Sequence, residues 1–149
     1  MYSISTTVCN KANAGTDGGV GLHFDTNSNA FSLYDDDDFH NRCSTGELNK
    51  EGINDWEEGV TQMWDIHELG DCADYKQDGY VFRPQKDLKV RVFVKSVVFF
   101  SDSVKICNIR VSFAYPYLTN GNKTQWEWSG EEWVNGEGTW HTMTIIQAS

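Results

Sequence analysis

The chain has 149 residues, of which 39% are hydrophobic and 13% aromatic, and its formal net charge is −10. This length and hydrophobic content predict one globular domain and exclude a disordered chain. The acidic surface repels phosphate, which excludes a nucleic-acid partner, and no run of about 20 apolar residues is present to cross a bilayer. Binding to an anionic membrane would therefore need bridging cations or exposed apolar loops.

Short apolar runs alternate with clusters of turn residues along the chain, and no helical pattern of about ten or more residues is present. This rhythm is typical of an all-β protein. Strands are expected at residues 3–9, 20–25, 30–34, 61–66, 88–94, 104–113, 125–128, 132–134 and 139–146.

Alternation within these runs indicates that each strand has one buried face. Val90, Val92 and Val94 share one side of their strand. The opposite side carries Lys89, Arg91, Phe93 and Lys95. Because each sheet needs a partner for its apolar face, the predicted fold is an antiparallel β-sandwich of about eight strands.

The C-terminal residues 114–149 are rich in tryptophan and contain two Asn-Gly turn signals, at Asn120-Gly121 and Asn135-Gly136. Asn-Gly favours the positive φ angles of tight hairpins. We therefore expect an extra C-terminal hairpin within a single domain that spans residues 1–149. The run Asp35–Asp38 is expected in an exposed loop, because adjacent carboxylates are costly to bury.

The four cysteines lie far apart in the sequence and form no CxxC pair, which disfavours a zinc site. Two disulfides in a secreted, extracellular protein are expected instead. Three pairings are possible, and the expectation taken here is Cys9 with Cys43 and Cys72 with Cys107.

Residues 3–113 resemble the PLAT domain, also called the lipoxygenase homology or LH2 domain. The resemblance is carried by several blocks in order along the chain, and each block is short. The blocks are Ala14-Gly15-Thr16-Asp17, Gly19–Phe24, Asn54–Thr61, Glu68–Cys72 and Ser101–Val111.

This resemblance implies an eight-stranded sandwich that occurs beside lipases and lipoxygenases and also as a stand-alone secreted module. Such a module is non-catalytic and docks to a lipid, a membrane surface or a protein partner. Several PLAT domains bind calcium at matching positions, and oxygen ligands from two neighbouring loops suit that ion. The implied calcium ligands are Gly15, Thr16, Asp17, Asn54, Asp55 and Glu57.

Aromatic residues provide the candidate contact surface. Trp56 and Phe39 are expected at apolar loop tips. Trp126 and Trp128 share one face of a strand, and Trp133 and Trp140 flank a turn and could lie across from each other. These four tryptophans could form a ligand-binding wall or cover one end of the core.

No residue pattern indicates an enzyme, since the sequence has neither HExxH nor GxSxG and the four histidines form no close pair. Two alternatives to a docking module stay open. The first is a carrier of an apolar small molecule such as a fatty acid or pigment, and the second is a carbohydrate-binding module that uses the C-terminal tryptophans. A secreted structural protein that assembles through edge strands is a third, and the oligomeric state is left open.

Overall fold

The computed structural model describes residues 2–12, 14–16, 19–25, 42–50, 56–73, 87–95, 103–114 and 123–148. Within them, eight antiparallel strands form one curled sheet in the order β3-β2-β5-β8-β7-β6-β1-β4. The strands are β1 (Tyr2–Val8), β2 (Gly19–Asp25), β3 (Arg42–Glu47), β4 (Thr61–Trp64), β5 (Leu88–Lys95), β6 (Val104–Ala114), β7 (Lys123–Val134) and β8 (His141–Ala148). No helix in the described part of the chain is long and apolar enough to span a membrane.

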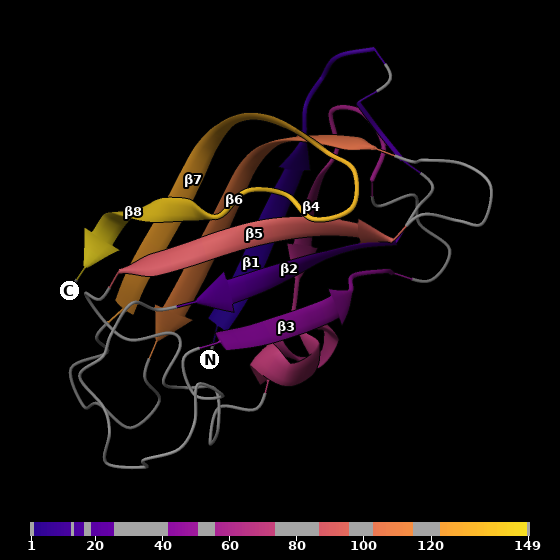
Figure 1. Cartoon of the computed structure of the whole chain (residues 1–149). Coiled ribbons are helices and arrows are strands. Elements are labelled where there is room, and N and C mark those ends of the chain that lie inside the picture. Colours follow the sequence, from indigo (N-terminus) through magenta and orange to yellow (C-terminus); the bar gives the residue numbers. More distant parts are fainter. Residues whose placement is uncertain are drawn as a thin grey trace.

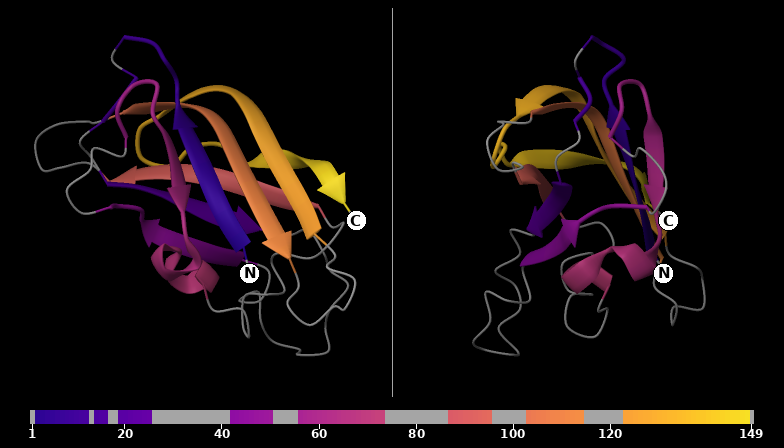
Figure 2. Two further views of the ribbon diagram at one scale, coloured as in Figure 1. Left: turned by 180° about the vertical axis from the view of Figure 1, so that it is seen from behind. Right: turned by 90° about the vertical axis from the view of Figure 1, so that its right-hand side faces the viewer.

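The sheet folds back on itself into two layers, and β8 joins them (Figure 1). Residues 141–143 of β8 pair with β5, whereas residues 144–148 pair with β7. One layer therefore contains β4, β1, β6 and β7, and the other contains β3, β2 and β5; the side view in Figure 2 separates them. The predicted β-sandwich is confirmed, and the segment expected as an added hairpin supplies β7 and β8 in the middle of the strand order.

A core of apolar side chains lies between the layers, because alternate residues of each strand point inward. Val90, Val92 and Val94 are all buried, as the alternation predicted, but Phe93 on the outward side of the same strand is buried as well. From the other layer, Ile109, Val111 and Phe113 enter the same core cluster. The largest fully buried side chains include Trp64 and Trp126.

Three strand predictions differ from the structure. Strand β3 was missed, because its sequence RCSTGE is polar and is a strand only through its pairing with β2. The strand predicted for residues 61–66 ends at Trp64, and short 3₁₀ helices follow at η2 (Ile66–Glu68) and η3 (Gly70–Ala73). The two short strands predicted at 125–128 and 132–134 form the single strand β7. The predicted strand 30–34 and the loop Asp35–Asp38 lie outside the described residues.

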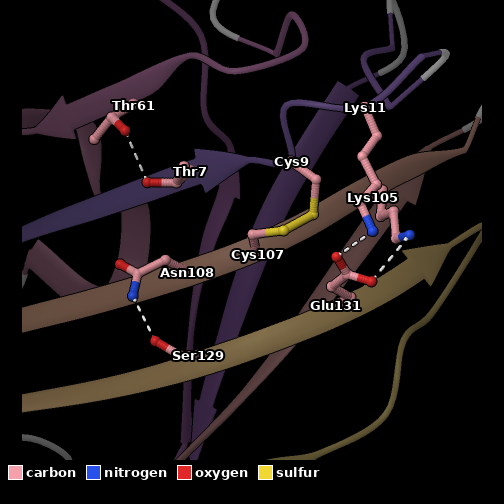
Figure 3. Close-up of a disulfide and its surroundings, with 9 residues drawn as sticks. All are labelled: Thr7, Cys9, Lys11, Thr61, Lys105, Cys107, Asn108, Ser129 and Glu131. Carbon is pink, nitrogen blue, oxygen red and sulfur yellow. Dashed lines mark hydrogen bonds and ion pairs between the residues drawn. A yellow bond between two sulfur atoms is a disulfide. The ribbon is translucent and has the colours of Figure 1, made fainter.

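Two disulfides are present, but the expected pairing is wrong. Cys9 bonds to Cys107 and Cys43 bonds to Cys72, with Cα–Cα distances of 5.0 and 5.2 Å. The first bridge forms because Val8, the residue before Cys9, is paired with Ile106 of β6 (Figure 3). The second ties β3 to η3, which lie against each other. Two disulfides indicate an oxidising environment such as the cell exterior.

The Asn135-Gly136 turn has the predicted positive φ, with Gly136 at 77°. The chain after it pairs with β5 and not with β7. Val94 donates a backbone hydrogen bond to Gly136, and Gly138 donates one to Val92, both at 2.7 Å. The return segment therefore leads Trp140 to β5 instead of placing it across from Trp133, as the sequence had led us to expect. The second predicted turn, Asn120-Gly121, lies outside the described residues between the paired ends of β6 and β7.

Candidate functional site

Backbone hydrogen bonds join the loop after β1 to the loop before β4 at one end of the sandwich. Thr16 donates to the carbonyl oxygen of Trp56 at 2.8 Å, and Gly59 donates to that of Cys9 at 3.2 Å. At the start of β6, Lys105 donates to the carbonyl of Ala14 at 2.9 Å. Both loops lie near the top of Figure 1, in indigo and magenta. We call residues 9–12, 14–16 and 56–60, with the start of β6 and the end of β7, the loop end.

The predicted calcium ligands belong to these two loops. Gly15 packs so closely against the second loop that a Cβ atom added to it would lie 2.7 Å from the carbonyl oxygen of Trp56. Glu57 follows Trp56 and is exposed. The structure thus brings Gly15, Thr16 and Glu57 together, while the predicted ligands Asp17, Asn54 and Asp55 lie outside the described residues.

The chemistry of this donor set fits calcium. A carboxylate from Glu57 and backbone carbonyls from Gly15 and Thr16 are the hard oxygen ligands that this ion prefers. In the described part of the chain, no three His, Cys, Asp or Glu side chains are grouped closely enough to hold a metal by themselves. A complete site would therefore also need the predicted carboxylates of the neighbouring segments.

An exposed tryptophan lies at the same end. The side chain of Trp133, near the end of β7, is 50% exposed. Lys105 is its cross-strand neighbour on β6, and the Lys105 ammonium lies 5.5 Å from the centroid of the indole ring. A cation at this distance is attracted to the face of the ring. Trp133 is thus held in place from one side while half of its surface stays available for a contact.

Lys105 also belongs to a small ion cluster beside the Cys9–Cys107 disulfide. Figure 3 shows Glu131 between Lys11 and Lys105. Hydrogen bonds from these two lysines lower the pKa of Glu131, and the bond to Glu131 raises the pKa of Lys11. Glu131 and Lys11 therefore stay charged near neutral pH.

Two of the predicted contact tryptophans are core residues. Trp56 is 6% exposed, donates its indole N–H to the carbonyl of Leu48 at 3.0 Å and stacks on Trp64. Trp126 is 0% exposed. Neither can contact a ligand at the surface, so the sequence prediction for both is wrong. Phe39 lies outside the described residues.

The remaining two tryptophans, Trp128 and Trp140, are half-buried and lie on different elements. Trp128 stacks on His141, with ring centroids 4.4 Å apart. Trp140 lies under the guanidinium of Arg91, whose central carbon is 4.7 Å from the ring centroid. The four C-terminal tryptophans therefore do not form one continuous wall.

Sequence reasoning missed the charged partners of the exposed aromatic residues. Lys105 and Arg91 each lie on the outward side of a strand, where alternation would place them. Alternation does not say which aromatic residue lies across from them, because that depends on strand order.

Solved structures with the same fold include a lipoxygenase and a bacterial toxin. The coral 8R-lipoxygenase, described as activated by calcium through a C2-like domain, has a TM-score of 0.59 at 11% sequence identity, over 97% of this chain and 16% of that chain. The alpha toxin of Clostridium absonum has a TM-score of 0.53 at 15% identity, over 96% of this chain and 30% of that chain. No family model and no curated protein matches the sequence.

This chain spans less than a third of either of these proteins. Likeness at such low identity establishes the fold. The chain is similar in fold to the PLAT or C2-like domain of lipoxygenases, in agreement with the resemblance seen in the sequence blocks.

Proposed function

We propose that this chain is a non-catalytic, secreted module that docks to a lipid membrane through its loop end, assisted by calcium. The observation that carries the proposal is the half-exposed Trp133, which lies beside Lys105 at the same end as Gly15, Thr16 and Glu57.

A tryptophan in this setting suits the boundary between water and lipid. Its ring is apolar enough to enter the headgroup region, and its N–H still finds a hydrogen-bond acceptor there. Lys105 lies over its ring, and Lys11 shares Glu131 with Lys105. Ammonium groups at the membrane boundary can contact lipid phosphates. Trp133 therefore replaces Trp56 as the proposed apolar contact.

The role proposed for calcium follows from the net charge of −10, which repels an anionic surface. An ion held by Glu57, the carbonyls of Gly15 and Thr16, and the predicted ligands Asp17, Asn54 and Asp55 would reverse that repulsion locally. Support comes from the similar fold in the coral lipoxygenase, which is described as activated by calcium through a C2-like domain. The two disulfides support an extracellular setting.

Co-sedimentation with vesicles of phosphatidylcholine, with and without phosphatidylserine, tests the proposal in calcium and in EDTA. We expect binding in calcium that weakens about tenfold in Trp133→Ala, because one interfacial anchor is lost. Met63→Ala is the matched control, since Met63 is 53% exposed but lies on β4 away from this cluster. Its vesicle binding should equal that of the wild type.

A second pair of variants separates the ion from the aromatic anchor. Glu57→Gln and Asp17→Asn should reduce only the calcium-dependent part of binding. Equal binding in calcium and in EDTA would remove calcium from the proposal. Absence of vesicle binding in every condition, or full binding by Trp133→Ala, would contradict membrane docking itself.

A further inference from the structure

The outer face of the β3-β2-β5 layer carries rows of side chains that run across the strands. In one row, Ser44, His23 and Arg91 are cross-strand neighbours, and Trp140 lies against Arg91. In the next row, Glu47, Gly21, Phe93 and Glu137 are neighbours. The two rows lie side by side, at the opposite side of the sandwich from the outer face of β1 and β6.

This face is hollowed at two adjoining places. One cavity of about 270 Å³ is lined by His23, Phe24, Arg42, Cys43, Ser44, Asp71, Arg91 and Trp140. The other, of about 410 Å³, is lined by His23, Ser44, Gly46, Phe93, Val94, Lys95, Gly136 and Glu137. Because His23 and Ser44 line both, the two form one elongated depression, which we call the outer groove. Its size lies in the range of small-ligand sites, about 300–1,000 Å³.

Gly21 makes the second part of the groove possible. A Cβ atom at Gly21 would lie 2.2 Å from the carbonyl oxygen of Gly46 and 2.3 Å from the Phe93 ring. Phe93 therefore lies flat over the glycine. Its ring also stacks on His23, with centroids 4.5 Å apart, so the two rings pack face to face and Phe93 is only 8% exposed.

Arg91 lies at the centre of the groove, where two of its three guanidinium nitrogens have partners. Its Nη2 lies 3.1 Å from His23 Nδ1 and its Nη1 lies 3.5 Å from a carboxylate oxygen of Glu137. The Nε of Arg91 is buried, and within the described residues no atom accepts its hydrogen bond. Burial, followed by the charge of Arg91, lowers the pKa of His23, which is consistent with a neutral ring that accepts a hydrogen bond from Arg91.

The cations of the groove have carboxylate partners, so its net charge is small. Arg42 contacts Asp25 at 3.2 Å, and Lys95 contacts Glu47 at 3.8 Å. Arg91 faces Glu137, and Asp71 adds a further acid at the rim. A phosphate or sulfate would have to compete with these carboxylates for each cation. A ligand with many hydroxyl groups can instead donate to the acids and accept from the basic groups.

We propose that the outer groove binds a neutral oligosaccharide. Sugars combine hydroxyl groups with an apolar ring face, and that combination matches the polar pairs of the groove beside the half-buried rings of Trp140 and His23. The elongated shape fits a chain of sugar units better than a single ring. This site is separate from the loop end and does not depend on membrane docking.

A glycan array that carries neutral and sulfated oligosaccharides tests the inference, followed by calorimetric titration with the strongest neutral ligand. We expect neutral glycans to bind and Trp140→Ala to weaken binding by at least about tenfold, because it removes an aromatic contact. Asp71→Asn should also weaken binding, and this exposed residue can be replaced with little risk to folding. Trp133→Ala should bind glycan as the wild type does, although its vesicle binding is weakened.

Three results would overturn the inference. The first is no binding of any neutral glycan at millimolar concentration by the folded protein. The second is wild-type glycan affinity in both Trp140→Ala and Asp71→Asn. The third is binding of sulfated glycans alone with a steep loss in salt, which would assign the groove to anions.

Discussion

The two layers of the sandwich are alike on the inside and different on the outside. The outer face of β1 and β6 carries short polar side chains that bond to their neighbours across the strands. Thr7 contacts Thr61, and Asn108 contacts Ser129, both at 2.9 Å. The outer face of β2 and β5 instead sets long side chains such as Arg91 beside a glycine.

The arrangement on the β2-β5 face leaves the outer groove. Alternation of period two decides only which residues face outward. Side-chain size then shapes each face: Phe93 packs over Gly21 on the β2-β5 face, whereas the long Arg110 lies beside Ser5 on the β1-β6 face. Function is therefore expected at the groove of the β2-β5 face and at the loop end.

The largest expected difference between the layers concerns their disulfides. The Cys9–Cys107 bond joins residues 98 positions apart, and the Cys43–Cys72 bond joins residues 29 apart. Replacing both cysteines of the first by serine should cost about 4 to 5 kcal/mol of unfolding free energy, and of the second about 3 to 4, because the longer loop gains more entropy when unfolded. Urea denaturation measures both, and a larger loss from the shorter bridge would contradict this account. Only the second pair should also weaken glycan binding, since Cys43 lines the outer groove.

Two tryptophans of β7 allow a substitution in the core to be compared with one at the surface. Trp126→Ala should cost about 3 to 5 kcal/mol, because it empties a fully buried site. Trp133→Ala should change the unfolding free energy by no more than about 0.5 kcal/mol, because the side chain is half exposed. Thermal or urea unfolding compares them, and similar losses would show that Trp133 belongs to the core.

Substitutions at Gly21 and Ser5 compare how tightly side chains pack on the two outer faces. Gly21→Ala should cost about 1 to 3 kcal/mol, since the new methyl group overlaps Gly46 and Phe93. Ser5→Ala, at an outward position on the other layer, should change stability by no more than about 0.5 kcal/mol. Equal stability of Gly21→Ala and the wild type would mean that Phe93 and Gly46 can shift to make room for the methyl group.

The smallest expected effect is a difference in how the free energy of unfolding changes at acidic pH. The pKa of His23 in the folded protein lies below its ordinary value of 6.5, mainly through burial, so the unfolded chain binds the proton more readily. Its stabilising contribution is complete above pH 6.5 and is lost as the pH falls through the folded pKa. On the other layer, hydrogen bonds from Asn108 and Arg110 lower the pKa of Glu127, whose ordinary value is 4.5. That contribution is complete above pH 4.5 and declines only at lower pH.

Urea midpoints measured as a function of pH distinguish these two windows. His23→Gln should remove the decline that begins near pH 6.5, and Glu127→Gln should flatten the curve only below pH 4.5. A wild-type curve that is level from pH 7 to 5 and unchanged in His23→Gln would show that burial of the His23 ring does not affect the stability of the protein.

The sequence by itself determined which side of the longest strands faces the core. Runs such as residues 88–94 and 104–113 alternate clearly, and burial of one side follows from the geometry of a strand and the hydrophobic effect. It also determined that Gly15 and Glu57 belong to neighbouring loops, through blocks that resemble a known domain. Both inferences rest on short sequence patterns that can be recognised without knowing the strand order.

Only the tertiary structure decided which distant residues meet. Strand order decides that Cys9 bonds to Cys107 and that Arg42–Glu47 is a strand. It also decides that Trp126 is buried while Trp133 is exposed, and that Trp140 lies against Arg91. A period-two pattern fixes the face of a residue but says nothing about its neighbour across the sheet. The groove and the loop end arise from those neighbours, because each is built from segments that lie far apart in the sequence.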